Sequence, residues 1–358
     1  MKAATPDEVN QCLADFDHVF AAGAFPASVP PAWARLRSGG ASSSDITALS
    51  DAFLSDRLRA SRQILGQTAY AEPAAKFILL PIKHLIALTW TRHEPACITV
   101  SVGLLEVLRA ECRTALLHAY FNRLTSNPAA MALLGRKADS VRRKGELLFQ
   151  YLHACSVIYF FEPGNLPDID ALLSTRTREK VTITLEAALI FLLLHELGHV
   201  DFRRRAGPSM SPGASTISEF VLPEELDARK EEELSADQFA LQQVPREFQL
   251  HLVHGATFLL NIHNYVERFS GKAPEHHPMS VNRLAALYAL VNQHPPQEPT
   301  GRLAIEQAVR VAREGWIDAA TPTSTGADLD ALKRFVASLR NANWSTTLAA
   351  IDLLAAQD

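Results

Sequence analysis

Cysteine pairing patterns are missing from this sequence. The chain has only four cysteines in 358 residues, and none of them forms a CxxC pair. Scattered cysteines are typical of proteins from a reducing compartment rather than of disulfide-rich secreted proteins. The first residues also lack a basic stretch followed by an apolar one, so we expect no secretory signal. These absences together predict a cytoplasmic location.

A strong net charge of either sign is also lacking. With 35 basic against 39 acidic residues, the formal net charge is -4 at pH 7. This balance provides no general electrostatic field for nucleic acid or anionic lipid. The most apolar segment, 187–194, is far shorter than the roughly 20 residues that a membrane span needs. We therefore expect neither a nucleic acid nor a membrane as a partner.

Two widespread catalytic motifs are absent, namely a Gly-rich phosphate loop and a GxSxG elbow. Nucleotide-driven and serine-hydrolase mechanisms are therefore without support. What the chain does have is a hydrophobic content of 47%, which is ample for a packed core. Apolar residues recur at spacings of three and four in many segments, and this periodicity is typical of helices. The clearest such segments are 45–64, 104–124, 141–159 and 329–339.

The sequence predicts a mainly helical α+β fold with a small sheet. Strands are predicted at 97–102 and at 157–161, and the second could equally be the end of a helix. Gly- and Pro-rich breaks divide the chain into three predicted parts. These are a helical N-terminal region of unknown role (1–165), a central core (166–295) and a helical C-terminal tail packed on the core (296–358).

His195 and His199 lie at the end of the apolar segment 187–194, which predicts a helix buried on most sides. On a helix the two imidazoles project from one face, one turn apart, at a separation that suits two positions of a tetrahedral zinc. Glu196 is offset by about 100° from His195, so it lies near the metal rather than on it. A carboxylate there can accept a proton from water that the metal has acidified. Without a bound ion these three polar groups would be buried and unsatisfied.

Zinc needs a third protein ligand, and the sequence after the helix indicates which residue provides it. A histidine six residues after His199 is excluded, because that position is Arg205. Further on, an acidic run changes at Glu233 to small and apolar residues, which predicts a second helix that is buried at this end. We predict Glu233 as the third ligand and Asp237, one turn later, as the acceptor of the ring N–H of His195. Most of the other carboxylates of the run are expected on a solvated face.

The paired motif HELGH (195–199) and ELSAD (233–237) resembles the gluzincin peptidases, whose pattern is HExxH with a later ExxxD. The resemblance covers roughly residues 186–290 and implies a zincin-like fold with an active-site helix and a glutamate helix. It also implies three zinc ligands, a general base and an aspartate that supports a ligand. On this chain these are His195, His199 and Glu233, then Glu196, then Asp237.

A further match is HPMSVNR (277–283), which is similar to the HPxxxxR element of the CAAX-processing branch of these peptidases. The resemblance implies that His277 and Arg283 face the tetrahedral intermediate, where donors aimed at a developing oxyanion stabilise it. The alternative is that His277 belongs to a loop before a helix and that Arg283 pairs with an exposed acid. That branch is largely membrane-embedded, and this chain shows no spanning segment of that kind. In length and motif placement the chain looks most like the intracellular phage-exclusion peptidases of the Lit type, with ImmA-like regulator proteases as a second option.

These inferences predict a zinc metalloendopeptidase whose core is 166–295 and whose cofactor is Zn²⁺. The expected partner is a protein or peptide substrate inside the cell, in phage defence or stress regulation. The alternative is a metal-binding sensor or partner-binding protein in which the zinc site is structural.

Overall fold

The computed structural model describes residues 1–21, 36, 41–56, 75–90, 95–206, 215–216, 226–269, 280–292 and 328–355. It divides the chain into two compact units. Unit 1 consists of Met1–Leu105 and Glu186–Asp318, and unit 2 consists of Glu106–Leu185 and Ala319–Asp358. The units interleave along the chain, whereas the sequence predicts three consecutive parts that meet near residues 165 and 295. The functional division into those parts stays a prediction.

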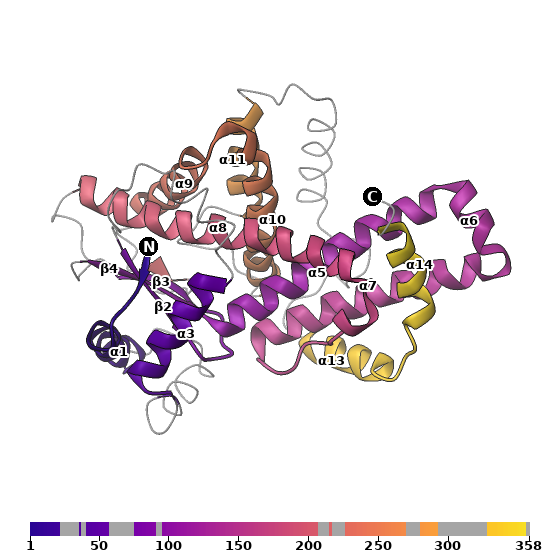
Figure 1. Ribbon diagram of the computed structural model, residues 1–358, viewed down its shortest axis with the longest axis horizontal. Coiled ribbons are helices and arrows are strands. Elements are labelled where there is room, and N and C mark those ends of the chain that lie inside the picture. Colours follow the sequence, from indigo (N-terminus) through magenta and orange to yellow (C-terminus); the bar gives the residue numbers. More distant parts are fainter. Residues whose placement is uncertain are drawn as a thin grey trace. The chain divides into compact units, whose positions relative to one another are not determined.

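A five-stranded mixed sheet forms one layer of unit 1 (Figure 1). Its strands are β1 (Lys2–Ala3), β2 (Ala75–Leu80), β3 (Ala87–Trp90), β4 (Ala96–Ser101) and β5 (Ser215–Thr216), in the spatial order β1-β2-β4-β3-β5. Strands β1, β2 and β4 are parallel, while β3 runs antiparallel to both β4 and β5. Strand β4 confirms the strand predicted at 97–102, and the small sheet in a mainly helical chain confirms the coarse fold class.

Helices α1 (Pro6–Ala21) and α3 (Ser43–Asp56) belong to unit 1, and α3 packs against β1 and β2. Their apolar side chains, among them Val9, Leu13 and Ile46, form a buried cluster with Ile78 and Leu80 of β2. The four cysteines are buried and free. The predicted helix at 45–64 corresponds to α3, and residues after 56 in that range lie outside the described residues.

The long helix α8 (Thr175–Ala206) carries the HELGH segment in its second half. In unit 1 this half lies between the sheet and a group of three helices (Figure 1). Those helices are α9 (Leu226–Gln242), α10 (Arg246–Phe269) and α11 (Ser280–Asn292). Nearly every side chain from Ala188 to Val200 is buried, which confirms the prediction of a helix buried on most sides.

Two glycines allow this helix to be approached closely. A Cβ added to Gly198 would lie 2.6 Å from the Cα of Ala236 in α9. A Cβ added to Gly255 of α10 would lie 2.4 Å from the carbonyl carbon of Ala187 in α8. Real Cβ atoms do not come this near to backbone atoms, so glycine at each position allows the helix axes to lie closer together.

Helix α8 is also long and apolar enough, by length and composition alone, to cross a membrane. Its most apolar 18-residue window has a mean hydropathy of 1.7, and 61% of this window is buried inside the structure. The apolar stretch is therefore longer than the segment 187–194 suggests. The core helix of a soluble protein passes the same test, so the expected absence of a membrane partner stays a prediction.

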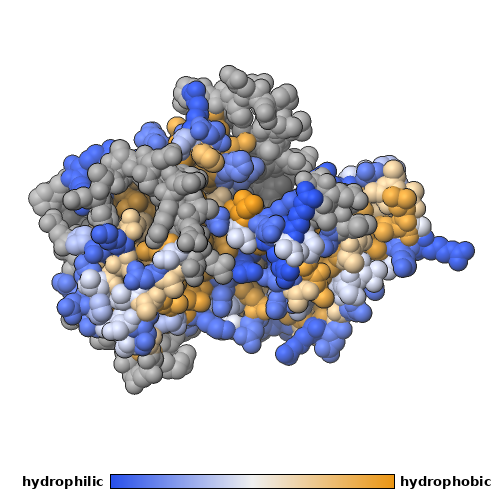
Figure 2. All heavy atoms as spheres, in the orientation of Figure 1, coloured by the Kyte–Doolittle hydropathy of each residue, from blue (hydrophilic) through white to orange (hydrophobic). Residues whose placement is uncertain are grey.

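Unit 2 is built from helices. Among the described residues they are α5 (Val102–Ser126) from Glu106 on, α6 (Pro128–Leu134), α7 (Ala138–Phe161), the first part of α8 up to Leu185, α13 (Asp328–Leu339) and α14 (Ser345–Ala355), together with two short 3₁₀ turns. The predicted segment 157–161 is the end of α7, so its helical alternative is the correct one. Helices α13 and α14 both pack against α7, and Leu348 and Ile351 of α14 join the buried cluster of this unit. Apolar residues also gather on the surface over α6 (Figure 2), where Leu133 is 90% exposed.

Candidate metal centre

Helix α8 places His195, Glu196 and His199 together in the interior of unit 1. The Nε2 atoms of His195 and His199 are 3.1 Å apart, as expected for two residues one turn apart on the same face. All three residues offer ligand atoms within 4.8 Å of one another, and all three are at most 5% exposed. The structure therefore assembles the predicted HExxH cluster as a buried group.

Helix α9 brings Glu233 to the same point. Its Oε2 lies 3.4 Å from Nε2 of His195, and its Oε1 lies 3.5 Å from Nε2 of His199. A tetrahedral zinc with bonds of about 2.0–2.1 Å requires ligand atoms separated by about 3.3 Å. Each Nε2 atom therefore lies at about this separation from one of the two oxygens of Glu233, and the two imidazoles and the carboxylate converge on one place.

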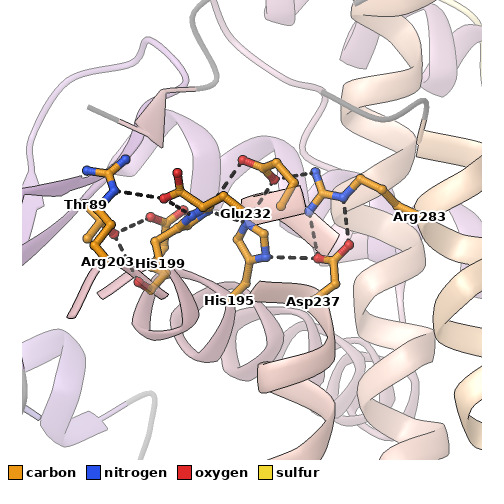
Figure 3. A network of polar contacts seen from close by, with 9 residues as sticks. Thr89, His195, His199, Arg203, Glu232, Asp237 and Arg283 are labelled. Carbon is orange, nitrogen blue, oxygen red and sulfur yellow. Dashed lines mark hydrogen bonds and ion pairs between the residues drawn. The ribbon is translucent and has the colours of Figure 1, made fainter. Parts of the chain in front are cut away.

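The far side of each imidazole faces a buried carboxylate (Figure 3). Nδ1 of His195 lies 2.9 Å from Oδ1 of Asp237, but the geometry is not that of a hydrogen bond, so the predicted role of Asp237 as acceptor stays a prediction. Nδ1 of His199 lies 2.9 Å from Oε1 of Glu232 and hydrogen-bonds to it. An ionised carboxylate only accepts, so in the neutral rings the proton is on Nδ1 and the lone pair is on Nε2. Both lone pairs are then available at the point where Glu233 arrives.

Arg283 of α11 holds this arrangement from the other side. Its Nε and Nη2 donate to the two carboxylate oxygens of Asp237 at 2.8 and 2.7 Å, and its Nη1 lies 3.0 Å from Oε2 of Glu233. The side chain is 2% exposed, so the alternative of a pairing with an exposed acid is wrong. Contact of Arg283 with a reaction intermediate stays a prediction. His277 lies outside the described residues.

The carboxylate of Glu196 contacts strand β3 of the sheet. The hydroxyl of Thr89 in β3 lies 2.5 Å from Oε2 of Glu196 and 3.3 Å from its backbone carbonyl oxygen. Thr89 is completely buried. Strand β3 thus fixes the orientation of the carboxylate predicted to act as general base.

Charge balance supports a divalent cation at this centre. Among the residues that the structure describes, the site contains four buried carboxylates and two guanidinium groups, which give these side chains together a net charge of minus two when the histidines are neutral. They are Glu196, Glu232, Glu233, Asp237, Arg203 and Arg283. Excess charge of one sign is costly in a buried site unless an ion compensates it. The donor set and its charge therefore fit a metal such as zinc.

The pKa values of this group reflect the pairing of opposite charges in the buried centre. Burial lowers the pKa of His195, but the carboxylates of Asp237 and Glu233 outweigh burial and raise it to about 10. Burial raises the pKa of Asp237, but Arg283 and His195 outweigh burial and the net pKa is below the usual value. In the metal-free chain the protonated form of His195 is therefore favoured. Its positive charge then lies where a metal cation would otherwise bind.

Three residues of this network were not predicted as site residues: Thr89, Arg203 and Glu232. The triple arginine after His199 is typical of a helix C-terminus, and the acidic run before Glu233 is typical of a solvated face. For two of these residues, their spacing from predicted ligands was a signal in the sequence. Arg203 stands four residues after His199, and Glu232 stands next to Glu233. Thr89 lies 107 positions from Glu196, so only the fold reveals their contact.

Comparison with known proteins adds one finding on activity. Residues 162–302 match the family model described as Peptidase U49. No curated protein and no solved structure matches the chain. The matched segment contains every residue of the centre except Thr89. The match supports a proteolytic function and hence a protein or peptide substrate.

Proposed function

We propose that this chain is a zinc-dependent endopeptidase with a gluzincin-type site and a zincin-like core. The observation that carries the proposal is the convergence of Nε2 of His195, Nε2 of His199 and the carboxylate of Glu233 within 3.5 Å of one another. Two nitrogens and one oxygen from protein leave a fourth position open, as in catalytic rather than structural zinc sites. The match to a peptidase family model favours peptide hydrolysis over other zinc-dependent reactions.

Each side chain has a role in this proposal. Zinc, when bound, would acidify a water molecule and polarise the peptide carbonyl. Glu196 accepts a proton from the attacking water, whose oxygen bonds to the carbonyl carbon. It then passes the proton to the amine nitrogen as the carbon–nitrogen bond breaks. Because Oε2 of Glu196 receives the Thr89 hydroxyl, we assign the proton transfer to Oε1.

Substitution of Glu196 by Gln tests the proposal. The variant keeps the size of the side chain but has no base, so we expect zinc content equal to that of the native chain. Peptide cleavage should fall by on the order of 10²–10⁴-fold, which is the contribution of a positioned general base. Elemental analysis measures the metal, and comparison of protein fragments from cells with the native or the variant chain measures cleavage.

The other outcomes of this experiment are equally informative. Identical fragment patterns in the two strains, with zinc bound in both, would overturn the peptidase and favour the metal-binding sensor. Fragments that appear only during phage infection would support a role in phage defence, and fragments under other stresses would support stress regulation. The cytoplasmic location and the intracellular protein substrate are proposals from the sequence, and the same fragments would identify that substrate.

A further inference from the structure

Glu232 is a buried carboxylate beside the metal centre and Arg203 is its partly buried partner, and neither has a role in the chemistry above. One oxygen of Glu232, Oε1, lies 2.9 Å from Nδ1 of His199 and 2.9 Å from Nε of Arg203. Glu232 is 5% exposed, and Arg203 comes from the last turn of α8, four residues after His199. The contact therefore joins the two metal helices behind one of the predicted ligands.

The arrangement repeats the one behind the other histidine. His195 faces Asp237, and Asp237 is held by Arg283. His199 faces Glu232, and Glu232 is held by Arg203. Each imidazole is thus backed by a carboxylate, and each carboxylate is backed by a guanidinium group (Figure 3).

The burial of the Glu232 carboxylate requires interactions that compensate its charge. Taking an ion of this kind out of water is unfavourable unless hydrogen bonds and opposite charge compensate. The oxygen Oε1 of Glu232 accepts from Nε of Arg203 at 2.9 Å, so the guanidinium charge compensates the buried carboxylate. The same oxygen lies 2.9 Å from Nδ1 of His199, where a carboxylate acts as an acceptor for the ring N–H.

We propose that Glu232, held by Arg203, is a positioning residue that keeps the proton of His199 on Nδ1 and directs its Nε2 lone pair at the metal. The proposal rests on the proposed metal site but adds to it a second support that the ExxxD pattern does not contain. Neither residue is a metal ligand or contacts the substrate in this role. The expected consequence is control of metal affinity, because outer partners of a ligating histidine affect affinity by about 10–100-fold.

Measured zinc affinity in four single variants tests the proposal, with zinc alone as the probe and a chelator as competitor. Glu232→Ala should bind zinc about 10–100-fold more weakly than the native chain. Glu232→Gln should lose less than Glu232→Ala, since its amide oxygen can still accept the Nδ1 proton. Arg203→Met should lose less than Glu232→Ala, because it removes only the group that holds Glu232. Arg205→Met is the matched control and should bind like the native chain, because this arginine is 64% exposed and pairs with Asp201.

A double variant separates this role from a merely structural one. If Arg203 acts through Glu232, Arg203→Met should weaken zinc binding little further when Glu232 is already Ala. Losses that add in full, or native zinc affinity in a folded Glu232→Ala chain, would overturn the proposal. If Glu232→Ala fails to fold, the Glu232→Gln and Arg203→Met chains decide, and native affinity in both would overturn it.

Nitrogen-15 spectra of the histidine rings give a second readout that needs neither metal nor activity. In the metal-free native chain, at a pH where the ring is neutral, His199 should carry its proton on Nδ1. A proton on Nε2 would overturn the proposal. A chain that binds zinc but cuts no peptide would contradict the proposed function and leave the affinity test intact. A chain that binds no zinc would contradict the metal site, and the spectra would still decide the role of Glu232.

Discussion

At the scale of single residues, the hydroxyl of Thr89 is the group that fixes one oxygen of Glu196. Substitution by Val keeps the shape of the buried side chain but removes the donor. A hydrogen bond to a charged group contributes about 1.5–3 kcal/mol, so peptide cleavage should fall on the order of tenfold or more. Zinc content should not change, since Thr89 contacts none of the predicted ligands through this bond. Steady-state cleavage of a peptide substrate, with elemental analysis alongside, measures both quantities.

Thr89→Ser is the control for this prediction, because serine keeps the hydroxyl and loses only a methyl group. It should restore most of the cleavage rate that Thr89→Val loses. Equal activity of the Val variant and the native chain would show that Glu196 needs no support from the sheet. Loss of zinc from the Val variant would show instead that Thr89 stabilises the whole centre.

Spacing along one helix made part of this centre predictable. His195 and His199 are four residues apart, so their common face follows from helical geometry alone. Glu233 could be predicted because the acidic run becomes apolar just after it, and the structure places it beside both histidines. The neighbouring Glu232 could not be separated from the run in this way, because its burial depends on Arg203 across the helix pair.

At the scale of elements, Gly198 determines how closely α9 can approach α8. Substitution by Ala would place a methyl group 2.6 Å from the Cα of Ala236, so α9 would have to move away. Metal ligands tolerate errors of only about 0.2 Å, so displacement of Glu233 should weaken zinc binding strongly. The helix itself should not suffer, because alanine is a better helix former than glycine by about 1 kcal/mol. Zinc affinity and circular dichroism measure these two effects separately.

The matched control for this prediction is Gly164→Ala. The nearest atom to an added Cβ there is the carbonyl oxygen of Glu162 at 3.8 Å, which is an ordinary contact. The control should therefore bind zinc like the native chain. Native zinc affinity in a folded Gly198→Ala chain would mean that the contact between α8 and α9 does not position the third ligand.

Periodicity predicted the helices better than the strands. Helices α5, α7 and α13 confirm the segments predicted from apolar spacings of three and four. Strand β2 was not predicted, because its sequence AKFILL is a nearly continuous apolar run without the alternation that marks a half-buried strand. Such a run is also found in buried helices, and only pairing with β1 and β4 distinguishes the two.

At the scale of the whole molecule, the residues of the site come from segments that are far apart in the sequence. Unit 1 takes four of its five strands from the first 105 residues, and its fifth strand and metal helices from residues after 186, with part of unit 2 encoded between them. In the sequence, the segments that carry Thr89 and Glu196 are therefore separated by residues 106–185, which belong to unit 2. A division into consecutive segments, as the sequence suggests, assigns them to different regions. This is why the role of the N-terminal segment could not be predicted from its residues.

Removal of the metal should lower the stability of the folded chain. The buried centre carries more negative than positive side chains, and a ligand that binds only the folded state adds stability as its concentration exceeds Kd. At a zinc concentration of 100 times Kd this contribution is about 2.7 kcal/mol, so a chelator should lower the midpoint of thermal unfolding. The Glu233→Gln chain should unfold at a midpoint that the chelator does not change, because one ligand is already lost. Calorimetry with and without chelator measures both midpoints. If the native chain loses zinc without a change in its midpoint, the proposal that the metal compensates the buried carboxylates is contradicted.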